Sequence, residues 1–158
     1  MTSDELCERA QSLIERGDFD TAVQDMDRAM DQEPENARLW LLKGVALGLA
    51  GKHAEALPCF ERCTELHPRV FSGWYHKGVA YAALGKGGEA IECYRRARRI
   101  DPTDASSAFN LGAELCKTGA LAEALEQFGD AKTLGHERAV QAHSACRQML
   151  QESKNTKS

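Results

Sequence analysis

Residues 40–44 read WLLKG, and residues 74–78 read WYHKG. The two stretches lie 34 positions apart, and each places a glycine four residues after a tryptophan. A sequence motif repeated at a fixed spacing is typical of a protein built from similar structural units that stack on their neighbours. Blocks of 34 residues counted from Ser3 bring these stretches, and most of the chain, into one register.

Four successive blocks carry the same residue types at the same positions. The eighth position is small: Ala10, Gly44, Gly78 and Gly112. The fifteenth is glycine: Gly17, Gly51, Gly85 and Gly119. The twentieth is alanine: Ala22, Ala56, Ala90 and Ala124. The twenty-fourth is large: Met26, Phe60, Tyr94 and Phe128. The thirty-second is proline three times and then histidine: Pro34, Pro68, Pro102 and His136.

Each block predicts a helical hairpin. Trp74 and Tyr81, seven residues apart, lie on one side of a first helix, helix A, because seven residues nearly complete two turns. A small eighth residue lets helix A approach a second helix, helix B. The fifteenth glycine ends helix A, and the late proline ends helix B. The expected helices cover 4–16, 20–33, 37–50, 54–67, 71–84, 88–101, 105–118 and 122–134.

This pattern resembles the tetratricopeptide repeat family, whose 34-residue period and W-x2-L-G-x2-Y, A-x3-F, P signature recur over residues 3–138. The resemblance implies an all-α fold, a right-handed superhelical α-solenoid of four helical hairpins with a C-terminal capping helix. We expect a single repeat domain over 3–151. The parts expected along the chain are repeats at 3–36, 37–70, 71–104 and 105–138, a capping helix at 139–151 and a frayed polar tail at 152–158.

The capping helix is expected to continue the helix A register. That register predicts four buried residues: Ala142, Ala145, Cys146 and Met149. In the third repeat, the position of the aromatic Phe19 of the first repeat is taken by Gly87, which is followed by Gly88. We therefore expect a looser turn there.

Charge and composition exclude several classes of function. The formal net charge is −4 over 158 residues, and residues 3–36 hold 3 basic and 11 acidic side chains, which argues against general nucleic-acid binding. The longest weakly polar run, 45–51, is too short to cross a bilayer, so no membrane association is expected. Residues 1–16 do not have the basic start and apolar core of a secretory signal, which favours a cytoplasmic protein with six reduced cysteines.

No motif indicates catalysis or a cofactor. The five histidines do not pair with a nucleophile and an orienting acid, so we expect a non-enzymatic protein without cofactors. Cys59, Cys63 and His67 share one helix face and could offer metal ligands. Because Cys63 replaces a small packing residue, we interpret the cysteines as apolar fillers and expect no metal site.

The resemblance also indicates a binding surface. In tetratricopeptide proteins the A helices line a concave channel that receives an extended or helical segment of a partner, and here three successive repeats are apolar at those positions. The expected groove residues are Leu41, Val45, Leu49, Tyr75, His76, Val79, Phe109, Asn110 and Ala113, with Arg38 and Lys117 at the rim. An alternative for Val45, Val79 and Ala113 is that they pack helix A on the next helix A. The expected function is a protein–protein interaction module or scaffold that binds a mostly apolar peptide or helical segment.

Two further expectations concern the partner. One subclass of the family grips the acidic C-terminal tail of chaperones with Lys, Arg and Asn residues, but this chain has Cys7, Gln11, Leu42, Ser72 and His76 there, so we expect no such binding. The alternative function is a self-associating structural protein, a homo-oligomer joined through its channel, its cap or its charged outer faces. The charged contact would join acidic residues of one copy to basic residues of another: Asp20, Asp25, Asp27 and Asp31 to Arg95, Arg96, Arg98 and Arg99.

Overall fold

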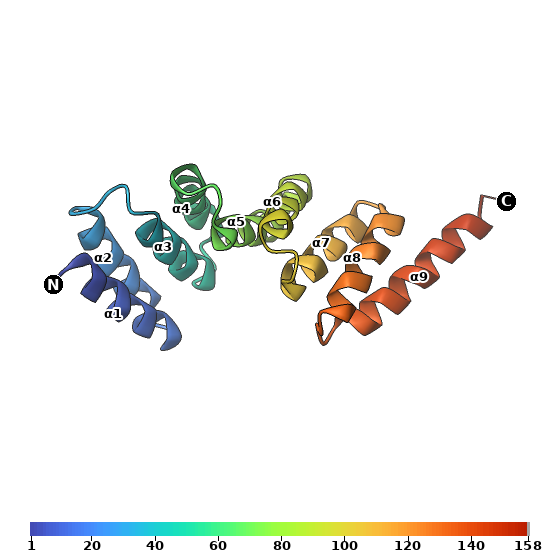
Figure 1. Ribbon diagram of the computed structural model, residues 1–158, viewed down its shortest axis with the longest axis horizontal. Coiled ribbons are helices and arrows are strands. Elements are labelled where there is room, and N and C mark those ends of the chain that lie inside the picture. The colour runs from blue at the N-terminus through green and yellow to red at the C-terminus, as the bar shows by residue number, and fades with distance from the viewer. Residues whose placement is uncertain (158) are drawn as a thin grey trace. The chain divides into compact units, whose positions relative to one another are not determined.

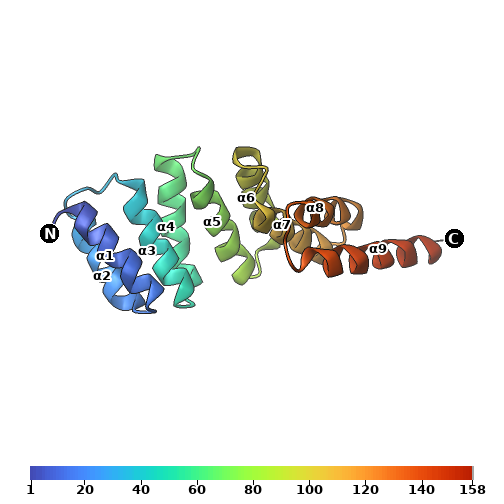
Figure 2. The same cartoon turned by 60° about the horizontal axis from the view of Figure 1, so that its bottom comes forward.

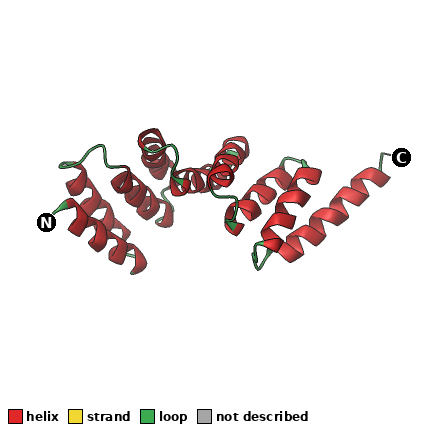
Figure 3. Cartoon of the chain, viewed as in Figure 1, coloured by secondary structure: helices red, strands yellow, loops and turns green. Residues whose placement is uncertain are grey.

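The computed structural model describes residues 1–157, which form nine α-helices and no strand within that range (Figures 1 and 3). The helices are α1 Ser3–Glu15, α2 Phe19–Met30, α3 Ala37–Leu49, α4 His53–Leu66, α5 Phe71–Ala83, α6 Gly87–Ile100, α7 Ala105–Lys117, α8 Leu121–Thr133 and α9 Ala139–Asn155. The all-α fold predicted from the period is confirmed, and the first eight helices begin and end within three residues of their expected bounds. None of the described helices is both long enough and apolar enough to pass through a membrane.

The helices divide into two compact units, Met1–Leu84 and the described residues from Gly85 onward. In the first unit, α1 pairs with α2 and α3 with α4, and α5 packs against α4 (Figure 2). In the second unit, α7 pairs with α8, while α6 packs against α7 and α9 against α8. The third predicted hairpin is therefore shared between the units, and a single domain over 3–151 stays a prediction.

Glycines end the A helices as the sequence predicts. Gly17, Gly51, Gly85 and Gly119 have φ angles of +80°, +80°, +73° and +83°, in the region that only glycine enters without strain. Gly135 adopts the same conformation, with φ of +86°, between α8 and α9. Each α-helix that ends at these glycines can thus reverse direction within a few residues. The looser turn expected at Gly87 and Gly88 concerns motion and stays a prediction.

Close helix pairing depends on the eighth and twenty-fourth positions of a repeat. A Cβ atom on Gly44 would lie 2.6 Å from Cε1 of Phe60, and one on Gly112 would lie 2.9 Å from the Phe128 ring. Each aromatic ring of helix B therefore lies directly on the glycine of helix A. The first repeat has Ala10 with Met26, both fully buried, and a flexible methionine leaves room for the extra methyl group.

The repeated tryptophans have a second role that sequence reasoning missed. The indole Nε1 of Trp40 donates a hydrogen bond to the Pro34 carbonyl oxygen, and that of Trp74 to the Pro68 carbonyl oxygen, each at 2.8 Å. Each tryptophan thus ties its own helix A to the loop that closes the preceding repeat. The WLLKG and WYHKG stretches recur because one residue joins two consecutive repeats.

Two expectations for the last helix are wrong. Helix α9 continues to Asn155, so residues 152–155 are helical and not frayed. Ala145 and Met149 were expected to be buried, but both are exposed, Met149 to 45%. Within the described residues no helix follows α9 that could cover these two side chains. Ala139 and Cys146 are the buried residues of α9.

Candidate functional site

Four of the predicted groove residues line one pocket in the first unit. Val45 and Leu49 of α3 face His76 and Val79 of α5 across a pocket of about 260 Å³, and Phe60 of α4 also contributes to its wall. The remaining lining residues are Gly48, His53 and Ala80. No acidic side chain, lysine or arginine is among them, so the pocket suits an apolar group.

Exposure distinguishes this pocket from the core. Leu49 is 60% exposed, and Val45 and Val79 are half-buried, although all three are apolar. A Cβ atom on Gly48 would meet no heavy atom within 4 Å, so the glycine leaves open space beside Leu49. Val45 also packs against the buried cluster that includes Ala80 of α5, so packing of one helix A on the next stays an alternative for Val45 and Val79.

His76 is held in the pocket by aromatic neighbours. Its ring stacks on Phe60, with centroids 5.7 Å apart and an interplanar angle of 17°, and meets the edge of Tyr75 at 5.2 Å. Burial lowers the pKa of His76. At neutral pH the side chain is therefore an uncharged ring that offers one hydrogen-bond donor and one acceptor.

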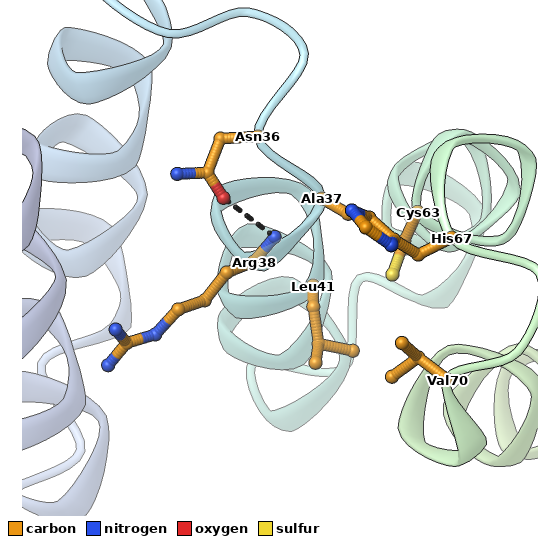
Figure 4. Close-up of a pocket in the computed structure, with 7 residues that line it drawn as sticks. All are labelled: Asn36, Ala37, Arg38, Leu41, Cys63, His67 and Val70. Atoms are coloured by element: carbon orange, nitrogen blue, oxygen red, sulfur yellow. Dashed lines mark hydrogen bonds between the residues drawn. The ribbon is translucent and has the colours of Figure 1, made fainter.

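A second pocket of about 430 Å³ lies at the other end of α3. In Figure 4, Leu41 of α3 lies across from His67 and Val70, and the guanidinium of Arg38 points away from them. The remaining lining residues are Asn36, Ala37 and Cys63. The side chain of Asn36 caps α3 by accepting a 3.1 Å hydrogen bond from the Arg38 backbone N–H.

Tyr75 lies outside both sets of lining residues. It is half-buried, and its ring stacks on Phe71, one turn earlier in α5, with centroids 5.6 Å apart. Leu41, Tyr75 and Phe109 all keep part of their surface exposed, so none of the three is sealed within its unit.

In the second unit, Phe109 has close packing partners. Its ring stacks on His136 at 4.1 Å, tilts against Phe128 at 5.6 Å, and lies 5.3 Å from the Arg138 guanidinium carbon. His136 and Arg138 were not among the groove residues expected from the sequence. The sequence feature that could have indicated His136 is the thirty-second position of the repeat, where His136 replaces the proline of the other repeats.

The other groove candidates of the second unit are polar or small. Asn110 and Ala113 on α7 are half-buried. Lys117 is exposed, and its Nζ lies 2.8 Å from a carboxylate oxygen of Glu114. The structure thus places the predicted residues in two separate units, and the two pockets described above lie in the first.

The cysteines of α4 behave as packing residues. Cys59 and Cys63 are 4% and 1% exposed, and burial raises the pKa of both thiols. The Cys59 thiol donates a weak hydrogen bond to the Glu55 carbonyl oxygen. Among residues 1–157 no group of three or more His, Cys, Asp or Glu side chains is placed to hold a metal ion.

Most of the charges proposed for a contact between copies have partners within their own unit. Asp20, Asp25 and Asp27 pair with Lys52, Arg9 and Lys43. Arg95 and Arg98 of α6 pair with Glu123 and Asp130 of α8. Asp25 is also fully buried. A charged contact between copies would have to break these pairs.

A comparison with family models decides the classification. The tetratricopeptide repeat model matches residues 7–57 and 48–105, which together make up more than half of the chain. The chain belongs to the tetratricopeptide repeat family. Proteins of this family are typically non-enzymatic modules for protein interaction.

Solved structures share the fold of this tetratricopeptide protein. The crystal structure of MamA protein matches with a TM-score of 0.85 at 20% identity, covering 92% of this chain and 81% of that one. MamA 41-end from Desulfovibrio magneticus RS-1 matches with a TM-score of 0.79 at 17% identity, covering 95% and 96%. YrrB, described as a TPR protein with an unusual peptide-binding site, matches with a TM-score of 0.81 at 20% identity, covering 92% and 76%. A search of curated proteins found no match.

Proposed function

We propose that this tetratricopeptide protein is an interaction module that binds a mostly apolar segment of a partner protein along α3. The supporting observation is the pocket in which Val45, Leu49, His76 and Val79 meet without any acidic, lysine or arginine side chain. The peptide-binding site described for YrrB, which has the same fold, is consistent with this proposal. Phe109, Asn110, Ala113, Arg38 and Lys117 stay predicted members of the groove.

The size of the pocket favours a side chain over a small molecule. Pockets for drug-sized ligands have volumes of roughly 300–1,000 Å³, and this pocket has about 260 Å³. Burying one large apolar side chain contributes about 1.5–3 kcal/mol, too little for stable binding alone. The partner segment therefore needs at least one more anchor.

The pocket beside Leu41 can take that second anchor. Leu41 and Val45 are four residues apart on α3, so their side chains lie on one face about 5–6 Å apart. Alternate residues of an extended peptide are about 6.6 Å apart and point to the same side. Residues four apart on a helical ligand have a similar spacing. The proposed ligand thus presents two large apolar side chains on one face.

Peptide display followed by affinity measurement tests this function. Peptides are selected on the immobilised wild-type protein, and their dissociation constants are measured by fluorescence anisotropy with wild type and with Leu49→Asp. Because Leu49 is 60% exposed, the substitution leaves the fold intact. We expect the selected peptides to share two spaced apolar residues and Leu49→Asp to weaken binding at least tenfold, about 1.4 kcal/mol.

The matched control is Leu134→Asp, at an exposed leucine of the second unit, which is 38% exposed and lies outside both pockets. Binding should be unchanged in this variant. Selected peptides that are acidic and without large apolar residues, or equal affinities for wild type and Leu49→Asp, would refute the proposal.

A further inference from the structure

The pocket between α3 and α5 contains two polar side chains, and both are histidines. His76 of α5 and His53, the first residue of α4, line it together with apolar residues and a glycine. Both side chains are half-buried, and within residues 1–157 neither takes part in a hydrogen bond. Their ring nitrogens are not sealed from solvent, because the buried nitrogens without a partner in this range belong to other residues. The pocket thus offers unpaired hydrogen-bonding groups on an apolar wall.

The two histidines differ in how firmly they are held. The His76 ring stacks on Phe60 and meets the edge of Tyr75, so two aromatic neighbours fix its plane. His53 makes no ring contact with any of residues 1–157. A group that is already fixed loses less conformational entropy when it forms a hydrogen bond with a ligand. His76 is therefore the better placed of the two to pair with a bound side chain.

An unpaired imidazole restricts which ligand fits the pocket. Burial lowers the pKa of His76, so at neutral pH its ring has one nitrogen that donates a hydrogen bond and one that accepts. A purely apolar side chain would displace water from these nitrogens without replacing the lost hydrogen bond, which costs binding free energy. A hydroxyl group can donate or accept, so it pairs with either nitrogen, whereas the indole N–H of tryptophan can only donate.

The wall of the pocket favours an aromatic ring beneath that hydroxyl group. Phe60 and His76 already present stacked rings there, and aromatic side chains gain from offset or edge contacts with such rings. Gly48 leaves open space beside Leu49, so the pocket is accessible on that side. Tyrosine is the side chain that combines a ring with a hydroxyl group.

We propose that this pocket of about 260 Å³ is a tyrosine subsite, in which the phenol hydroxyl hydrogen-bonds to His76 and the ring lies against apolar residues of α3 and α5. The proposal rests on the proposed function, because it identifies one of the two anchors of the partner segment. A pocket without a pairing histidine would prefer phenylalanine, because burying a hydroxyl group without a partner costs free energy. Pairing with His76 and apolar burial alone therefore predict opposite orders of affinity.

The test uses the full chain and two small probes, p-cresol and toluene, which are the side-chain analogues of tyrosine and phenylalanine. Valine and leucine methyl groups are isotope-labelled, and the shifts of the Val45, Leu49 and Val79 methyl resonances give both dissociation constants by NMR titration. We expect wild type to bind p-cresol roughly threefold or more tighter than toluene, the usual effect of one net hydrogen bond.

Two variants of the same pocket make the result specific. His76→Phe keeps a ring against Phe60 but has no hydrogen-bonding group, so toluene should become the tighter ligand. His53→Phe, the same substitution at the other histidine, should keep the wild-type preference for p-cresol. Circular dichroism checks that both variants are folded, and the order of affinities in wild type tests the proposal without either of them.

Three results would overturn the proposal. They are toluene binding at least as tightly as p-cresol in wild type, neither probe shifting the three methyl resonances, and a preference for p-cresol that survives in His76→Phe. The peptides selected by display separate this proposal from the proposed function. Peptides that depend on Leu49 but bind equally well after tyrosine is replaced by phenylalanine would refute the subsite alone. Preference for p-cresol without any selected peptide would refute the proposed function alone.

Discussion

At the scale of single residues, the fold depends on contacts that leave no spare room. The Phe60 and Phe128 rings rest on glycines, so the missing side chains of Gly44 and Gly112 set the distance between paired helices. The buried charge of Asp25 depends on a single partner in the same way. The Asp25 side chain is 1% exposed, and both its carboxylate oxygens accept 2.7 Å hydrogen bonds from Arg9.

Gly44→Ala is expected to destabilise the protein by about 1–3 kcal/mol, since the added methyl group overlaps the Phe60 ring. Gly48→Ala, in the same helix, meets no atom within 4 Å and is expected to stabilise by up to about 1 kcal/mol through higher helix propensity. Urea unfolding followed by circular dichroism measures both changes. Equal effects in the two variants would show that the ring contact does not limit the helix separation.

Arg9→Met is expected to cost about 3–5 kcal/mol, because it leaves the buried Asp25 carboxylate without its charge partner. Lys52→Met removes the ion pair with Asp20, whose side chains are 46% and 82% exposed, and is expected to cost less than about 1 kcal/mol. Both variants keep an apolar stem, so their difference in unfolding free energy reports the buried charge. Similar losses in the two variants would contradict this account.

At the scale of helices, the connection between repeats depends on a tryptophan and a proline. Trp40 and Trp74 each reach back to the carbonyl oxygen of the preceding proline. The fourth repeat has Ala108 in this position, and the proline after it is replaced by His136, which stacks on Phe109. The fourth repeat thus ends in an aromatic stack, and its helix A has no tryptophan that could reach back to Pro102.

Trp74→Phe is expected to lose about 0.5–1.5 kcal/mol, the usual contribution of one hydrogen bond, while a large part of the apolar ring remains. Trp74→Ala is expected to lose roughly 3–5 kcal/mol through the cavity it leaves. Lys77→Met, which removes the ammonium group 5.1 Å from the Trp74 ring, should cost at most about 1 kcal/mol. Urea unfolding of the three variants measures these losses, and wild-type stability in Trp74→Phe would remove the indole hydrogen bond from the explanation.

At the scale of the whole molecule, each unit contains a histidine whose pKa is lowered by folding. Burial lowers the pKa of His76 in the first unit. In the second unit, burial and then the nearby Arg147 and Lys132 lower the pKa of His143. The unfolded chain binds these protons more readily than the folded one, so acid favours unfolding of both units.

Above the unfolded pKa of His76, near 6.5, the side chain is uncharged in both the folded and the unfolded chain and does not reduce the free energy of unfolding. As the pH falls through and below that value, the unfolded chain binds a proton more readily than the folded one, so the free energy of unfolding decreases. His76→Phe keeps a ring against Phe60 but cannot bind a proton. We expect urea midpoints measured between pH 7.5 and pH 5 to fall less steeply in this variant than in wild type. An unchanged slope would show that His76 is equally easy to protonate in the folded and unfolded chain.

Periodicity in the sequence was sufficient for the helices, the hairpins and the glycines with positive φ, because these features depend on residues within a few turns of one another. The eighth, fifteenth and twenty-fourth positions of the repeat carry the residues that predict these features. Gly44 and Gly112 at the eighth position, for example, pair with Phe60 and Phe128 at the twenty-fourth. The same periodicity predicted equivalent groove residues in three repeats, and the structure makes them unequal. Val45, Leu49 and Val79 line an open pocket, whereas Phe109 packs against His136 and Arg138, and Met149 is exposed where burial was expected. Exposure depends on which side chains from other helices cover a position, and that information comes from packing between elements and not from the period of any one of them.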